Sequence, residues 1–199
     1  MTDIKPNVFL DCGSNHGQGF EHFRKIYHTG FHYMLFDANR FCCEFLHNKY
    51  KDDPTIVIYN NAIYSQAGKK TFTFRSEDDV GGSLVDVHNS AYKDYFYLSS
   101  IDKLESCKQT VNCIDINALI NNLLSKIYNN IIIKMDIESA EYDVLESMIE
   151  HGTIKKVKKM YIEFHTKFML SKDREQYIQR EYNIIDWMHL NNIDWEFWG

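Results

Sequence analysis

The side chains of this chain that are best suited to catalysis lie within residues 131–145. Three isoleucines lead into Lys134, and Asp136, Glu138 and Glu141 follow where a buried strand should turn into a helix. In open α/β sheets, ligands bind outside the carboxyl ends of the strands. A carboxylate there could take a proton from a hydroxyl group of a substrate. The lysine could orient that carboxylate or lower the pKa of the hydroxyl group. We therefore predict a catalytic site here, with Asp136 as its leading residue.

Each of these residues also has a purely structural interpretation. Acids in the first turn of a helix are stabilised by the helix dipole, and Lys134 with Asp136 could be a satisfied ion pair. His165, at the end of a later strand, could face an acceptor or simply cap and pack. The acids could also bind a hard divalent cation, although we expect no metal site.

A second motif lies at the first strand-to-helix turn. Asp11, Gly13 and Gly17 have the spacing D-x-G-x-x-x-G, and Asp37 follows Gly17 by twenty residues. An acid at that distance can accept hydrogen bonds from both ribose hydroxyls of an adenosine-containing ligand. The dinucleotide fingerprint instead uses G-x-G-x-x-G to bind a pyrophosphate, which Asp11 would repel. The motif favours S-adenosylmethionine over NAD, with a ligand-free glycine turn as the structural alternative.

These motifs sit on alternating strands and helices. The hydrophobic pattern predicts strands at about 7–11, 33–37, 55–59, 131–136, 157–164 and 193–197, and helices at about 17–28, 41–50, 115–128, 140–151 and 173–190. Such alternation implies βαβ units and a parallel, doubly wound sheet. The pattern changes to period two near residues 71–74 and 110–114, which predicts an antiparallel insertion around 65–114.

Bulk properties narrow the class of protein. The 199 residues are enough for one domain over 1–199, and 44% apolar content excludes a disordered chain. A net charge of -6 provides no basic field for nucleic acid. The five cysteines have no C-x-x-C spacing, which favours reduced thiols and a cytoplasmic location. Neither an apolar signal core nor an apolar run long enough for a membrane span is visible.

Four sequence segments together resemble the FkbM-type methyltransferases, a branch of the S-adenosylmethionine-dependent class I superfamily. They are FLDCGSNHG (9–17), LFDAN (35–39), NAI (61–63) and IKMDIESAE (133–141), with GSL (82–84) and YIEFH (161–165) as weaker members. The resemblance implies a Rossmann-like class I methyltransferase fold. This chain has Asp37-Ala38 where the family usually has Glu-Pro, and Ser139 where it usually has glycine. It is also short after Phe164, which predicts a shortened C-terminal sheet edge.

The resemblance implies roles for particular residues around an S-adenosylmethionine donor, whose product would be S-adenosylhomocysteine. Asp136 would lie near the transferred methyl group. The residues expected to contact the donor are, from its methionine end to its adenine, Asp11, Gly13, Asn15, Gly17, Asp37, Ala38, Asn61 and Ala62. The candidate catalytic set is Asp136, Lys134, Glu138, Glu141 and His165.

The leading hypothesis is an O-methyltransferase that acts on a sugar or another small hydroxylated acceptor. One alternative is methylation of an RNA 2′-hydroxyl, which Lys134 and Asp136 superficially fit but the net charge opposes. Another is a non-catalytic module that binds a nucleotide or a partner. The short sheet edge could pair with a second copy of the chain. We expect the insertion and the helix after Phe164 to shape the acceptor pocket, where Tyr92, Tyr95, Phe96 and Tyr97 could stack on a sugar or belong to the core.

Overall fold

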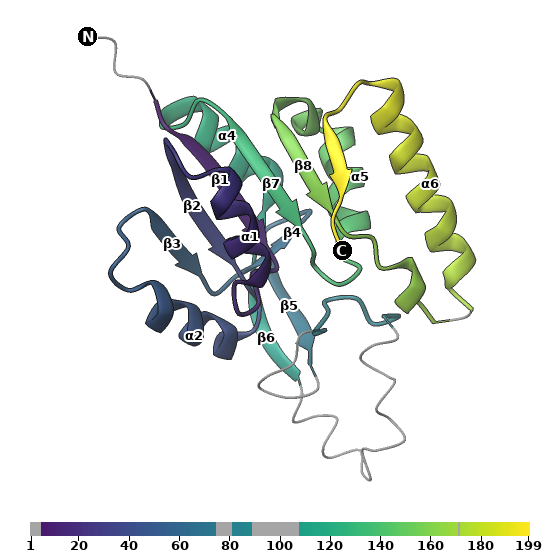
Figure 1. Cartoon of the computed structure of the whole chain (residues 1–199). Helices are drawn as coiled ribbons and strands as arrows, with labels where there is room; N and C mark the ends of the chain where they lie inside the picture. The colour runs from purple at the N-terminus through teal and green to yellow at the C-terminus, as the bar shows by residue number, and fades with distance from the viewer. Residues whose placement is uncertain (1–4, 75–80, 89–107, 171) are drawn as a thin grey trace.

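The large sheet of the protein is parallel throughout, as predicted. The computed structural model describes residues 5–74, 81–88, 108–170 and 172–199. Six strands are arranged in the order β3-β2-β1-β7-β8-β9 (Figure 1). Their bounds are β1 (Asn7–Cys12), β2 (Phe31–Phe36), β3 (Ile56–Tyr59), β7 (Ile131–Met135), β8 (Lys159–Ile162) and β9 (Trp195–Phe197).

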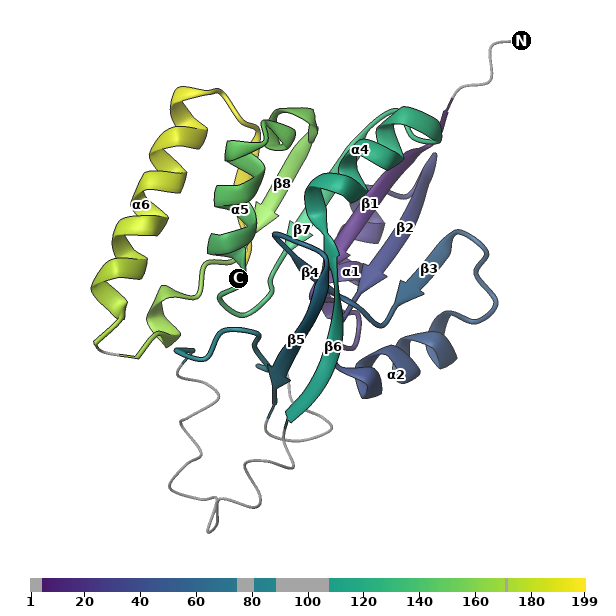
Figure 2. The ribbon, with the colours of Figure 1, turned by 180° about the vertical axis from the view of Figure 1, so that it is seen from behind.

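Helices cover both faces of this sheet. On one face α1 (Gln18–Ile26) and α2 (Arg40–Tyr50) pack their buried aromatic and leucine side chains against β1 and β2. On the other face lie α4 (Ile116–Lys126) and α5 (Glu141–Glu150), with α6 (Arg174–Leu190) packed on α5 (Figure 2). Strands buried on both faces are near-continuous apolar runs, and all five residues of β7 are buried. The parallel, doubly wound prediction is confirmed.

The insertion forms a small sheet of its own. It contains β4 (Ala62–Tyr64), β5 (Gly68–Thr73) and β6 (Lys108–Asp115) in the order β4-β6-β5. β5 pairs antiparallel with β6 as expected, whereas β4 pairs parallel with β6. The aromatic residues Tyr92, Tyr95, Phe96 and Tyr97 lie outside the described residues. β5 and β6 reach past the carboxyl ends of the large sheet (Figures 1 and 2), so they border the place where the site is expected.

The sheet ends at the short strand β9, which pairs parallel with β8 from Met160 opposite Trp195 to Ile162 opposite Phe197. Short 3₁₀ turns, η2 (Thr153–Lys156) and η3 (Thr166–Phe168), flank β8. The strand predicted at about 157–164 ends at Ile162, and the chain after it turns toward the site. No helix in the ranges given above has the length and apolar character that a membrane crossing requires. The cysteines within the described ranges, Cys12, Cys42, Cys43 and Cys113, are buried and form no disulfide there.

Candidate active site

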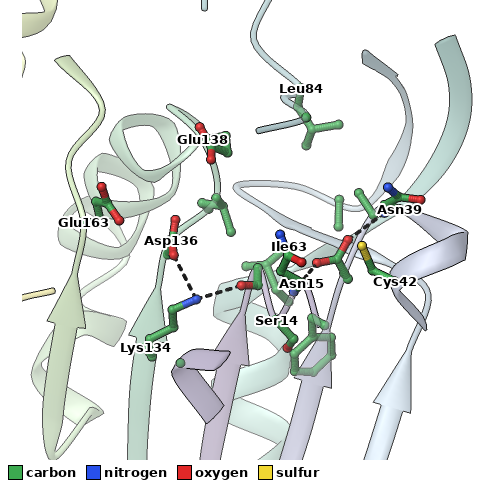
Figure 3. Close-up of a pocket in the computed structure, with 18 of the residues that line it drawn as sticks. Ser14, Asn15, Asn39, Cys42, Ile63, Leu84, Lys134, Asp136, Glu138 and Glu163 are labelled. Carbon is green, nitrogen blue, oxygen red and sulfur yellow. Dashed lines mark hydrogen bonds and ion pairs between the residues drawn. The ribbon is translucent and has the colours of Figure 1, made fainter. Parts of the chain in front are cut away.

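A cavity of about 390 Å³ opens at the carboxyl ends of β1, β2, β7 and β8. We call the part around Asn15 and Asn39, whose amides bind Asp37, the Asp37 end, and the part around Asp136 and Glu138 the Asp136 end (Figure 3). Ten predicted site residues line the cavity: Gly13, Asn15, Asp37, Ala38, Asn61, Ala62, Lys134, Asp136, Glu138 and His165. Three others, Asp11, Gly17 and Glu141, are absent from its lining and are fully or almost fully buried behind it.

Gly13 makes the turn between β1 and the pocket. Its φ of +80° lies in the left-handed region, and its amide donates a 2.9 Å hydrogen bond to the carbonyl of Phe36. A Cβ added at this position would lie 1.7 Å from the carbonyl oxygen of Asp136. The absence of a side chain at Gly13 therefore lets the backbone after β7 approach, and Gly13 also lines the cavity, where we expect a ligand.

Gly17 serves the start of α1 rather than the pocket, contrary to the expectation that it contacts the donor. It is the N-cap residue, with a φ of +85°. A Cβ there would lie 2.8 Å from the hydroxyl oxygen of Tyr50. Only glycine combines a left-handed φ with so close a neighbour.

Asp37 is the centre of its end of the pocket. It follows β2 directly, and both carboxylate oxygens accept backbone hydrogen bonds: Oδ2 from the amide of Asn15 at 2.7 Å and Oδ1 from that of Asn39 at 2.8 Å. Asn39 also caps α2 by accepting a hydrogen bond from the amide of Phe41. Burial raises the pKa of Asp37 to about 6, although the two amides act in the opposite direction. The backbone therefore holds this carboxylate in one orientation.

Lys134 connects the two strands at the centre of the sheet. Its Nζ donates to the carbonyl of Gly13 at 2.7 Å and lies 3.1 Å from Asp136 Oδ2 and 3.3 Å from Asp11 Oδ1. The side chain is 3% exposed. Burial alone would lower the pKa of Lys134, but the two carboxylates raise it above its ordinary value. Lys134 is therefore a buried cation that holds Asp136 in place (Figure 3).

Asp11 does not line the pocket, contrary to our expectation. It lies opposite Lys134 in the register of β1 and β7 and is fully buried. The side chains of a strand alternate between its two faces, so Asp11 points to the same face as Phe9, which packs against α1. Its role in this structure is to partner Lys134.

The turn from β7 into α5 has a strained backbone. Glu138 and Ser139 have φ values of +52° and +80°, a region that disfavours residues other than glycine. Glycine is the residue that adopts this conformation most readily. Ser139 does not cap the helix: α5 begins at Glu141, after Ala140, with no side-chain cap, and the buried Ser139 Oγ has no hydrogen-bond partner among the described residues.

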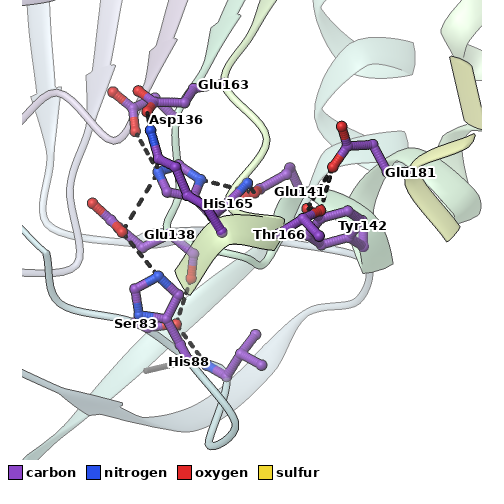
Figure 4. Close-up of polar contacts among 12 residues, drawn as sticks. Ser83, His88, Asp136, Glu138, Glu141, Tyr142, Glu163, His165, Thr166 and Glu181 are labelled. Atoms are coloured by element: carbon purple, nitrogen blue, oxygen red, sulfur yellow. Dashed lines mark hydrogen bonds and ion pairs between the residues drawn. The ribbon is translucent and has the colours of Figure 1, made fainter. Parts of the chain in front are cut away.

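His165 is oriented by Glu141 at the Asp136 end. Glu141 Oε1 lies 2.8 Å from His165 Nδ1 and accepts a 3.0 Å hydrogen bond from its backbone amide. Burial lowers the pKa of His165, but Glu141, Glu138 and Asp136 raise it more strongly, to about 9. The imidazole therefore carries a proton at neutral pH. Glu141 is fully buried, so it supports His165 rather than facing an acceptor (Figure 4).

Sequence reasoning missed three residues of this region. Glu163 and Trp198 line the pocket, and the Nε2 of the fully buried His88 lies 3.1 Å from Glu138 Oε2. Glu163 follows the end of β8, the same signal that singled out Asp136. His88 carries no such signal, because a long-range bridge to Met169 brings it here.

The insertion contributes to the cavity, as expected. Phe72, Gly82 and Leu84 line it. A Cβ at Gly82 would lie 2.3 Å from the ring of Phe72, so the segment 81–88 packs closely over β5. The expected contribution of α6 is wrong for the described residues, because none of its residues lines the cavity.

A family model described as the methyltransferase FkbM domain matches residues 11–185 of the chain. The chain belongs to the FkbM methyltransferase family. The matched residues of this FkbM domain include both the Asp37 end and the Asp136 end of the cavity. No curated protein and no solved structure matches the chain.

Proposed function

We propose that this FkbM-family methyltransferase uses S-adenosylmethionine to methylate a hydroxyl group of a sugar or another small acceptor. The observation that carries the proposal is the orientation of Asp37. Its two oxygens are fixed by the amides of Asn15 and Asn39, and the carboxylate lies in the wall of the cavity. A carboxylate at the end of the second strand is the expected partner of the two ribose hydroxyls of an adenosine group.

The rest of the Asp37 end also fits this donor. Asn61 and Ala62, which we expect to flank the adenine, line the cavity, and so do the apolar side chains of Phe72 and Leu84. A cavity of about 390 Å³ is within the usual range for small-molecule sites. Gly13 would lie against the methionine part of the donor. When bound, the donor supplies a methyl carbon that is already activated by a positively charged sulfur.

Asp136 is the residue to which we assign proton transfer. The oxygen–carbon bond to the methyl group forms as the carbon–sulfur bond breaks, and the acceptor hydroxyl must lose its proton. Asp136 lines the cavity at its own end and is held by Lys134 at 3.1 Å. His165 is already engaged at Nδ1 by Glu141, so Asp136 is the better candidate for that proton. Positioning and proton removal together account for the chemistry that such a transfer needs.

The charge of the cavity supports a small acceptor over nucleic acid. Lys134 is the only lysine or arginine among the described residues that line the cavity. It is already engaged by Asp11, Asp136 and Gly13. Phosphate backbones are bound by available lysines and arginines, and the Asp136 end instead presents carboxylates.

Two measurements test the proposal. Calorimetric titration with S-adenosylhomocysteine should show binding to one site per chain; no heat and no thermal shift at millimolar ligand would contradict the donor assignment. An acceptor screen that detects formation of S-adenosylhomocysteine, run on hydroxylated sugars, small phenols and amines, should then find activity with a hydroxyl acceptor. Turnover only with amines would refute O-methylation while leaving the donor site intact.

A further inference from the structure

Three potential metal ligands converge at the Asp136 end. One ligand atom from each of Asp136, Glu138 and His165 can be chosen so that all three lie within 4.8 Å of one another. His165 Nε2 lies 3.5 Å from Glu138 Oε2 and 3.6 Å from Asp136 Oδ1. These distances are longer than a normal hydrogen bond of about 2.7–3.2 Å. The three groups therefore face a common point without forming good hydrogen bonds to one another (Figure 4).

The spacing suits a shared ion. Nitrogen and oxygen ligands lie about 2.0–2.2 Å from Zn²⁺, which places two ligands of one tetrahedral ion roughly 3.4 Å apart. The two distances from His165 Nε2 are within a few tenths of an ångström of that value. The carboxylate oxygen Oε1 of Glu163 lies 3.9 Å from His165 Nε2.

The imidazole is held in the manner of a metal ligand. His165 is 2% exposed, and its Nδ1 is bound by the fully buried carboxylate of Glu141. A metal-ligating histidine almost always donates its other ring N–H to a carboxylate, carbonyl or water, which fixes the ring and aims the free nitrogen at the metal. The nitrogen aimed into the cavity here is Nε2. The oriented imidazole distinguishes this site from a cluster of acidic side chains alone.

Glu138 is positioned independently of the other two ligands. Its carboxylate lies 3.1 Å from Nε2 of the fully buried His88, and its carbonyl accepts a hydrogen bond from the hydroxyl of Ser83. The left-handed φ of Glu138 sets the direction of the backbone between β7 and α5. Backbone strain of this kind persists only where the surroundings hold it in place.

The local charge also favours a cation. Four carboxylates lie within 4 Å of the two ring nitrogens of His165, those of Asp136, Glu138, Glu141 and Glu163. A divalent ion bound among them would offset two of these negative charges.

We propose that Asp136, Glu138 and His165 bind a divalent first-row metal ion, of the Mn²⁺ or Zn²⁺ kind, at the acceptor side of the cavity. An imidazole with two carboxylates favours these ions over Ca²⁺. This replaces our expectation of no metal site. The role of the ion rests on the proposed function: it would bind the acceptor hydroxyl and lower the pKa of that hydroxyl.

The test is a titration of the chelator-treated protein with MnCl₂, followed by the loss of the electron paramagnetic resonance signal of free Mn²⁺. No donor or acceptor is present. We expect one bound Mn²⁺ per chain, with nitrogen coupling from an imidazole in pulsed spectra. Glu138→Gln should weaken binding by more than about tenfold. The matched control is Glu150→Gln, the same change at an exposed position on α5, which should leave the affinity unchanged.

The outcomes separate this proposal from the proposed function. Absence of Mn²⁺ binding, binding without nitrogen coupling, or equal loss in the two glutamate variants would overturn the metal site. Thermal unfolding of each variant shows whether it is folded, and Asp136→Asn serves as a second ligand variant if Glu138→Gln is not. Titration of the same preparations with S-adenosylhomocysteine reports on the donor site alone. Metal binding without binding of this product would refute the donor assignment and leave the metal site standing.

Discussion

The two ends of the cavity are built in different ways. At the Asp37 end, backbone amides do the positioning: Asn15 and Asn39 hold one carboxylate, and the nearby wall is largely apolar. At the Asp136 end, charged side chains hold one another. Lys134 holds Asp136 at 3.1 Å, and Glu141 holds His165 at 2.8 Å.

This difference predicts different consequences of substitution. A site held by backbone amides at turns and strand ends keeps its shape when a single side chain is changed. A site made of buried ion pairs depends on each partner, because removing one leaves a buried charge uncompensated. Substitutions at the two ends should therefore fail in different ways: loss of binding at the Asp37 end, and loss of turnover at the Asp136 end.

Asp136→Asn should produce the largest effect on turnover. With an acceptor found by screening, we expect kcat to fall by about 10²- to 10⁴-fold, the usual contribution of a proton-transfer group. Affinity for S-adenosylhomocysteine should change little, because we assign the ribose to Asp37 and not to Asp136. Asp186→Asn, the same change at an exposed position on α6, is the control. Unchanged turnover in an active preparation of Asp136→Asn would remove this residue from the mechanism.

Gly13→Ala should destabilise the whole protein, because this glycine joins the two ends. The new Cβ would meet the carbonyl oxygen of Asp136 at 1.7 Å, at a φ of +80°. We expect a loss on the order of 3–5 kcal/mol in the free energy of unfolding, measured by chemical denaturation. Gly30→Ala is the matched control. Its φ is +73° with nothing within 4 Å, so it should cost only about 1–2 kcal/mol. Equal losses in the two variants would contradict the close contact.

Asp37→Asn should weaken the donor site without a comparable loss of fold. The carboxylate accepts two backbone hydrogen bonds and would accept more from a ribose. Losing interactions with a charged acceptor costs about 1.5–3 kcal/mol, so calorimetry should show an affinity for S-adenosylhomocysteine roughly 10- to 100-fold lower. Asp52→Asn, at an exposed position after α2, should bind as the unmodified chain does. Equal affinities in the two variants would place the ribose elsewhere.

The pH dependence of binding gives the smallest expected effect. Burial raises the pKa of Asp37 to about 6, and the ionised form is the one that accepts hydrogen bonds from ribose. Affinity for S-adenosylhomocysteine should therefore be constant above about pH 7 and fall as the pH drops through 6. By pH 5 about a tenth of the carboxylate is ionised, so the loss is about tenfold. In Asp37→Asn this dependence should disappear; its persistence would assign the titration to another group.

The sequence predicted most of the fold and of the Asp37 end because their signals are local. Alternating strands and helices predict the parallel sheet, and a spacing of twenty residues from Gly17 singles out Asp37. The parallel pairing of β4 with β6 could not be read this way, because it depends on a contact across the insertion.

The Asp136 end was harder to predict because its contacts are long-range. His88 comes from the insertion, and Glu141 acts through His165 rather than in the cavity. Asp11 was misplaced because it lies within β1, where the alternation of the strand turns it toward α1. The left-handed conformation of Ser139 could not be predicted, because a serine gives no sequence signal for a positive φ.

A crystal structure of the protein with S-adenosylhomocysteine would test the donor site most directly. We expect both ribose hydroxyls within about 2.6–3.2 Å of the Asp37 carboxylate, the adenine beside Asn61 and Ala62, and the sulfur on the side of Asp136. A ligand bound away from Asp37, or a cavity that takes up none at saturating concentration, would contradict the assignment of this cavity as the methyl-donor site.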